Sequence, residues 1–113
     1  MKNRLLVMNG QKIIQHEIGG QWKNDKVEKA GLLKPGIYNL YMNSVVDKLK
    51  EQEGIVVHSD KNTVYQQVGK SYISHNRADF EKVPEPGVNL NIKYSQGKAV
   101  VETSDKLARS LSR

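Results

Sequence analysis

The fold is decided by residues 63–101, TVYQQVGKSYISHNRADFEKVPEPGVNLNIKYSQGKAVV. The stretch predicts strands at 63–68 and 71–75 around a glycine turn, then a proline-rich corner that cannot lie inside a sheet, and a final hairpin. Apolar and polar residues alternate from 88 to 94, which indicates a strand with one buried face. Together with a strand at 54–58, this order predicts a mainly β fold, a small strongly bent sheet or barrel of about five strands.

Working outward, Asn9-Gly10 separates two apolar runs, 4–8 and 11–16. Asn-Gly favours a type I′ turn, so we expect an N-terminal hairpin in which Leu6 faces Ile13 and Leu5 faces Ile14. Both faces then carry apolar residues, which indicates that both are covered or that one meets a partner.

One or two short helices complete the expected fold. The first is predicted at 25–30, where Asp25 and Glu28 form a capping pattern. A second is predicted at 44–53, where a charged loop is the alternative, and Asn76 is expected to cap one helical turn after the strand at 71–75. Between the first two lies a predicted strand at 37–42.

These elements predict three parts: an N-terminal hairpin and Trp22 segment (1–35), a β-barrel domain (36–103) and a basic C-terminal tail (104–113). The expected core consists of Leu6, Ile13, Tyr38, Leu40, Val57, Val64, Val68, Ile73, Phe80, Leu90, Ile92 and Val100.

The net charge of +6 is unevenly distributed. Residues 1–43 carry +4, residues 44–103 are neutral and residues 104–113 carry +2. Basic ends favour phosphate binding, although lysine often serves only solubility. The candidate nucleic-acid-binding residues are therefore Lys2, Arg4, Lys12, Lys106, Arg109 and Arg113, with Tyr65 and Tyr72 as stacking platforms. For the two tyrosines, cross-strand packing in the core is the alternative.

No catalytic pattern appears in the sequence. The chain has no cysteine, and its histidines, at positions 16, 58 and 75, are too widely spaced to indicate a zinc site. No serine-nucleophile or phosphate-loop motif is present. We therefore expect a protein that is not an enzyme and uses no cofactor or metal. Without a signal peptide or a long apolar run, we expect it to be soluble and cytoplasmic.

The central residues resemble the KfrB domain of conjugative plasmid proteins. The similarity rests on GIVVH (54–58), VYQQVGK (64–70), IKY (92–94) and GKA (97–99), with GIYNLY (36–41) ahead of them. His75, Arg77 and Phe80, then Pro84 and Gly87, also fit the pattern.

The resemblance implies a bacterial accessory protein of plasmid maintenance or transfer, linked with a KfrA-like DNA-binding protein. It implies a protein-binding module, with direct nucleic-acid binding as the alternative. The candidate partner-binding residues are then His75, Arg77 and Phe80, at the corner where the strand at 71–75 ends, together with Gln66 in the middle of the strand at 63–68. An oligomer is compatible with these expectations, and no membrane association is expected.

Overall fold

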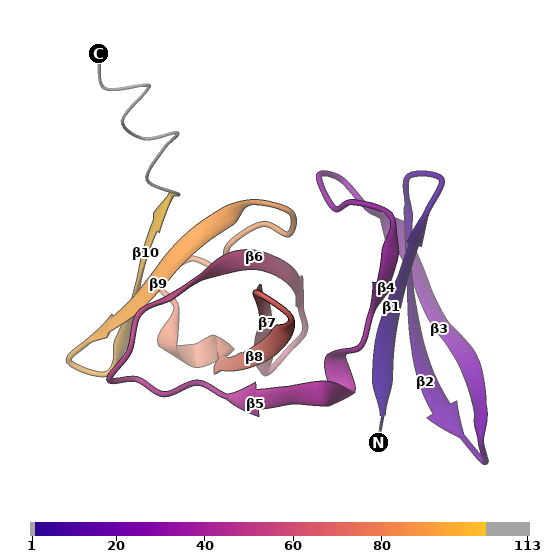
Figure 1. Ribbon diagram of the computed structural model, residues 1–113, viewed down its shortest axis with the longest axis horizontal. Helices are drawn as coiled ribbons and strands as arrows, with labels where there is room; N and C mark the ends of the chain where they lie inside the picture. The colour runs from indigo at the N-terminus through magenta and orange to yellow at the C-terminus, as the bar shows by residue number, and fades with distance from the viewer. Residues whose placement is uncertain (1, 104–113) are drawn as a thin grey trace.

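The computed structural model describes residues 2–103, which form two packed β-sheets (Figure 1). The four-stranded sheet A has the order β3-β2-β1-β4. Its strands are β1 (Asn3–Met8), β2 (Gln11–Ile18), β3 (Gln21–Lys29) and β4 (Gly36–Tyr38). A 3₁₀ turn, η1 (Leu40–Met42), leads from sheet A into the second sheet.

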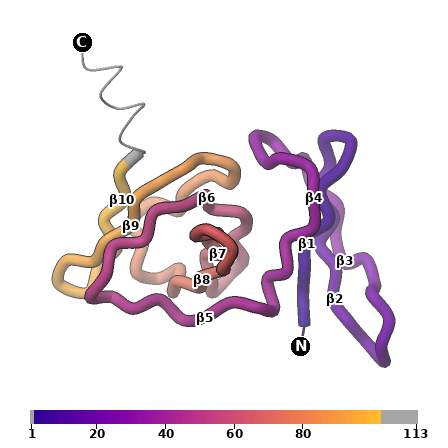
Figure 2. Tube along the Cα trace, in the orientation of Figure 1, coloured from indigo at the N-terminus to yellow at the C-terminus, as the bar shows by residue number. Residues whose placement is uncertain are grey.

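The six-stranded sheet B has the order β10-β9-β6-β7-β8-β5. Its strands are β5 (Asn43–Val45), β6 (Gln52–Ser59), β7 (Thr63–Val68), β8 (Ser71–Asn76), β9 (Asn89–Ser95) and β10 (Lys98–Thr103). The sheet curls around β7 and β8 beside sheet A, as the chain trace in Figure 2 shows.

Sheet B does not close into the barrel that the sequence predicted. β10 and β5 are its edges, whereas closure requires that every strand pair on both sides. Residues 80–82 lie beside residues 99–101 of the edge strand β10. This segment continues into Pro84 and Pro86, which lack the N–H that a ladder needs. The mainly β class and the strong bend are confirmed.

The N-terminal hairpin is confirmed with its predicted register. Leu6 pairs with Ile13 and Leu5 with Ile14. Asn9 and Gly10 both have positive φ, 52° and 75°, as a type I′ turn requires.

The helices predicted at 25–30 and 44–53 are wrong. Residues 21–29 form the edge strand β3, because pairing along the whole length of β2 outweighs a weak local capping pattern. Residues 43–45 form β5, paired in parallel with β8, and Asp47 then caps a turn by accepting a hydrogen bond from the Leu49 N–H (3.0 Å). The Asn76 cap is confirmed: its Oδ1 accepts from the Ala78 N–H in the 3₁₀ turn η2 (Arg77–Asp79).

Two apolar cores lie on opposite sides of the β6–β7 pair. The inter-sheet core packs Leu5 and Val7 of sheet A against sheet B, including Val57 and Tyr65. The inner core fills the concave side of sheet B. It consists of Val56, Val64, Phe80, Leu90 and Ile92. Neighbouring residues of β6 and β7 therefore enter different cores, as side chains alternate along a strand.

Half of the expected core residues are buried: Leu40, Val57, Val64, Phe80, Leu90 and Ile92. Leu6 and Ile13 were placed on the wrong face, because sheet B covers the side of the hairpin that carries Leu5, Val7 and Ile14. The other four, Tyr38, Val68, Ile73 and Val100, are only partly buried. Within residues 2–103, no helix has the length and apolarity to cross a membrane.

Candidate functional site

Gln66 and His75, two candidates for partner binding, meet inside the curl of sheet B and not on its surface. Gln66 is 0% exposed and His75 is 1% exposed. The Gln66 amide nitrogen lies 3.1–3.2 Å from the backbone carbonyls of Gln52, Gly54 and Leu90, on β6 and β9. His75 joins the Gln66 Oε1 to the Tyr94 hydroxyl, at 2.9 and 2.8 Å.

The direction of each hydrogen bond in this network follows from Gln66. Its amide nitrogen donates to carbonyls, so its oxygen must accept from the His75 Nε2–H. The His75 Nδ1 is then unprotonated and accepts from the Tyr94 O–H. Burial lowers the pKa of His75 to about 4, against a weaker opposing effect of Asp79. Burial, with the Asp79 charge, raises the pKa of Tyr94 to about 12. The network therefore ties β6, β7, β8 and β9 together as neutral groups.

The remaining two partner-binding candidates do not complete a surface patch. Phe80 is 8% exposed and contacts the His75 ring edge-on, with centroids 5.7 Å apart. Arg77 is exposed but turns to the β6–β7 loop, where its Nη1 donates to the Asp60 carbonyl (2.7 Å). His75 and Phe80 therefore pack inside the fold, and Arg77 is the only one of the four candidates that is exposed.

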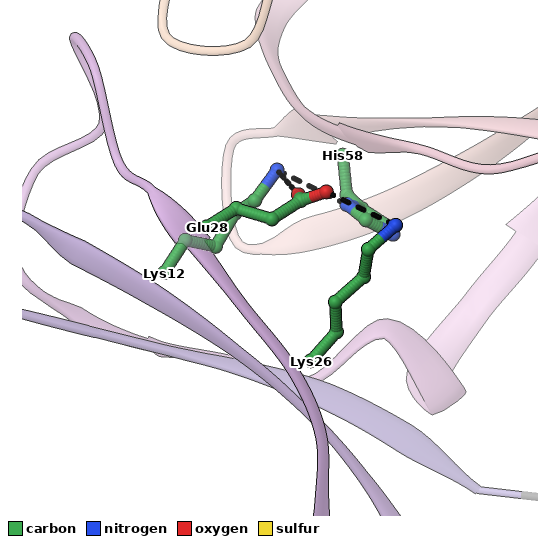
Figure 3. Close-up of polar contacts among 4 residues, drawn as sticks. All are labelled: Lys12, Lys26, Glu28 and His58. Carbon is green, nitrogen blue, oxygen red and sulfur yellow. Dashed lines mark hydrogen bonds and ion pairs between the residues drawn. The ribbon is translucent and has the colours of Figure 1, made fainter.

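A second polar cluster lies between the sheets (Figure 3). The Lys12 ammonium, from a side chain only 6% exposed, contacts Glu28 Oε1 and His58 Nδ1, both at 3.3 Å. Lys26 pairs with the other Glu28 oxygen at 3.4 Å. An ammonium can only donate, so His58 Nδ1 accepts and the ring is neutral.

The pKa values in this inter-sheet cluster follow from burial and the lysine charges. Burial, together with the Lys12 charge, lowers the pKa of His58 to about 4. Burial alone would raise the pKa of Glu28, but hydrogen bonds and charge from Lys12 and Lys26 outweigh it and the pKa is lowered. An open cleft of about 480 Å³ borders this cluster. Its lining mixes acidic and basic groups, which favours no ligand of one charge. Across residues 2–103, no three His, Cys, Asp or Glu side chains are placed to hold a metal.

The nucleic-acid-binding candidates are scattered. Tyr65 and Tyr72 are each 8% exposed within the inter-sheet core, which leaves no ring face for a base. The Lys12 ammonium is already bound by Glu28 and His58 in the cluster just described. Lys106, Arg109 and Arg113 lie outside the described residues. Arg4 of β1 and Lys2, which precedes that strand, remain, and both lie on the side of sheet A that faces away from sheet B.

That side, the outer face of sheet A, carries an uncovered apolar row. The backbone register places four side chains abreast across the sheet: Val27, Ile13, Leu6 and Ile37. Val27 and Ile37 are each 54% exposed, and Met8 beside the row is 43% exposed. Figure 1 shows no element of the described chain over this side of β2 and β3.

An aromatic and cationic cluster lies next to the apolar row on the same face. The Arg4 guanidinium lies 4.1 Å from the Trp22 ring centroid, and Lys2 lies 5.4 Å from that of Tyr41. The two rings are 5.9 Å apart. Sequence reasoning selected Lys2 and Arg4 by charge but missed Trp22 and Tyr41. The available signal for Trp22 was that it is the only tryptophan in the sequence.

The fold and its register define a small all-β protein of two packed sheets with one sheet face uncovered. The KfrB domain family matches residues 52–103, from the start of β6 to the end of β10. Protein TraB of Escherichia coli is 34% identical over 112 residues, an alignment that covers 93% of this chain and 75% of that protein. The chain belongs to the KfrB-domain family of conjugative plasmid accessory proteins.

The two matches differ in extent. The KfrB match omits sheet A, whereas an alignment over 93% of the chain must include part of it. The similarity to TraB therefore extends beyond the KfrB domain into the N-terminal region.

Proposed function

We propose that this plasmid accessory protein is a non-catalytic protein-binding module that docks a partner on the outer face of sheet A. The uncovered row of Val27, Ile13, Leu6 and Ile37 carries the proposal. A soluble domain normally covers such a row, and contiguous exposed apolar surface marks interaction sites.

The composition around the row supports a protein partner. Interface centres are enriched in Trp, Tyr, Met and Arg. Met8 and Arg4 adjoin the row, and Trp22 and Tyr41 lie beyond Arg4 on the same face. A base would find one face of Trp22 already occupied by Arg4, and an aliphatic row offers nothing to a phosphate. Nucleic-acid binding is therefore the less supported function, because it rests on the basic ends of the sequence and not on a surface that the fold assembles.

The face is a better docking site than the sheet edge. β3 is a long edge strand, but its pairing with β2 is interrupted at Asp25, and Lys23, Asn24 and Lys26 flank this irregularity. Bulges and charges are the devices by which proteins prevent strand addition at an edge. A second copy is also disfavoured, because the register places three cations on this face, Lys2, Arg4 and Lys29, against the carboxylate of Glu17, so two such faces would repel.

Site-specific photocrosslinking in a host that carries the parent element tests the proposal. A benzophenone side chain at position 27 or 37 should yield an adduct with one other protein of the element, and the same group at Gln96, in the β9–β10 turn, should not. Val27→Lys with Ile37→Lys should abolish binding of that purified protein. Val45→Lys, at a residue 82% exposed on β5, is the matched control and should retain binding. Adducts only with a second copy, or none, would refute the proposal.

Fluorescence anisotropy with single- and double-stranded DNA tests the alternative function. Phosphate-driven binding must weaken steeply as salt is added. If the protein bound DNA with such a dependence and no protein crosslinked to the outer face, the nucleic-acid function would replace the proposed one.

A further inference from the structure

Arg4 is held by a hydrogen-bonded ladder that crosses sheet A. Its Nε donates to Gln15 Oε1, and the Gln15 amide nitrogen donates to Asn24 Oδ1, both at 2.8 Å. The three residues lie at paired positions on β1, β2 and β3. Gln15 is only 8% exposed, so its amide is fixed by these two bonds. The ladder therefore fixes the direction in which the Arg4 Nε–H points.

Trp22 fixes the plane of the same guanidinium. The Arg4 Cζ lies 4.1 Å from the indole centroid, a distance at which the cation and the ring attract. Tyr41 packs against Trp22 in turn. One long, flexible side chain is thus restrained twice, once by the Gln15 hydrogen bond and once by the indole.

The charge of this restrained group has no acidic partner. Each ion pair within residues 2–103 involves Lys12, Lys26, Lys48, Lys93 or His16, and none involves Arg4. With Nε used by Gln15, the two terminal nitrogens still present the fork that matches a carboxylate. Glu17 lies on the same face but is not within ion-pair distance, so this preorganised fork is poised to receive an acid from outside.

We propose that Arg4 is the carboxylate receptor of the outer face, and that it selects a partner segment carrying an Asp or Glu side chain beside apolar residues. This inference rests on the proposed function, since it names the chemistry of the partner that docks there. Arg4 and Leu6 lie two residues apart on one strand face, about 7 Å. An extended partner strand therefore fits with its acid two positions from an apolar side chain.

Peptide display on the full-length protein tests this chemistry. A random linear library without tryptophan is panned against the wild-type protein, and enriched peptides are synthesised. Trp22 is the only tryptophan, so its fluorescence reports binding at the site itself. Enriched peptides should carry Asp or Glu at a fixed spacing from an aliphatic residue. Replacing that acid by its amide should weaken binding about tenfold, the loss expected for a charged hydrogen bond.

Variants separate the Arg4 fork from mere positive charge. Arg4→Lys keeps the charge but loses the fork and the ladder, and should weaken binding about as much as the acid-to-amide change. Lys70→Gln, in an exposed turn of sheet B, removes one charge elsewhere and should leave binding unchanged.

The outcomes distinguish the two proposals. Peptides that lose affinity with Val27→Lys and Ile37→Lys but tolerate Arg4→Lys and the amide change would overturn the carboxylate receptor and leave the docking face intact. Peptides indifferent to all four changes would overturn the docking face as well. An oligothymidine that binds through Arg4 more tightly than any enriched peptide would show a phosphate site and overturn the inference.

Discussion

Lowering the pH from 7 to 5 is expected to reduce the unfolding free energy by about 4 kcal/mol, through His58 and His75. Each imidazole is buried and neutral in the fold, with a pKa lowered to about 4 from the ordinary 6.5. Below pH 6.5 these imidazoles are therefore protonated in the unfolded chain but stay neutral in the folded chain. The contribution of the two neutral rings to the unfolding free energy is fully present above pH 6.5 and falls as the pH approaches 4.

The magnitude follows from proton linkage. For a pKa difference of this size, one group contributes about 2 kcal/mol between pH 7 and pH 5. Two such groups remove about 4 kcal/mol, a large share of the 5–15 kcal/mol typical of a domain, as a rough guide. The pH range stops at 5 so that carboxylates such as Glu28, whose pKa is lowered, stay ionised.

Urea unfolding at pH 7 and pH 5 measures the effect, with circular dichroism and Trp22 fluorescence required to coincide. His75→Gln should roughly halve the pH dependence, and His58→Gln should do the same independently. The readout is the difference between two pH values, so a general destabilisation by either variant cancels. A wild-type difference below about 1 kcal/mol, or NMR signals assigned to the His58 and His75 rings that titrate near 6.5 in the folded protein, would refute the assignment of neutral buried rings.

Two further predictions concern packing and the inter-sheet ion cluster. Gly54→Ala should cost about 3 kcal/mol or more by urea unfolding, because a Cβ there would lie 1.9 Å from the Gln67 carbonyl oxygen; Gly10→Ala, in open space but at positive φ, should cost only about 1 kcal/mol. Glu28→Gln should cost about 2 kcal/mol, because the buried Lys12 ammonium loses its carboxylate, and adding Lys12→Met to that variant should recover part of the loss, because no buried charge is then left; a double variant no more stable than Glu28→Gln would contradict this account.

Local sequence signals predicted the strands well where the residues that determine a turn or an alternation lie within a few positions of one another. Asn9-Gly10 fixed a turn and therefore a register, and the alternation around Leu90 and Ile92 fixed which residues share a face. Local signals failed where pairing partners were distant. The capping pattern of Asp25 and Glu28 instead serves an edge strand, in which Glu28 reaches the buried Lys12 of β2.

The candidate sites show the same division. The sequence pointed to Gln66 and His75 as candidate binding residues. In the structure their polar groups form hydrogen bonds inside the fold and are not exposed to a partner. A polar residue between strands can face either side. Only the curl of sheet B, which brings three carbonyls to the Gln66 amide, decides that it is buried.

The sequence by itself determined that the chain is mainly β, that it begins with an Asn-Gly hairpin and that its residues resemble the KfrB domain. Side-chain alternation also showed that both faces of that hairpin are apolar. Only the tertiary structure decided which face is covered, since that depends on where sheet B packs and not on any local pattern. Leu5 and Val7 are thereby buried, Leu6 and Ile13 join the outer face, and Arg4 is laid on Trp22 beside them.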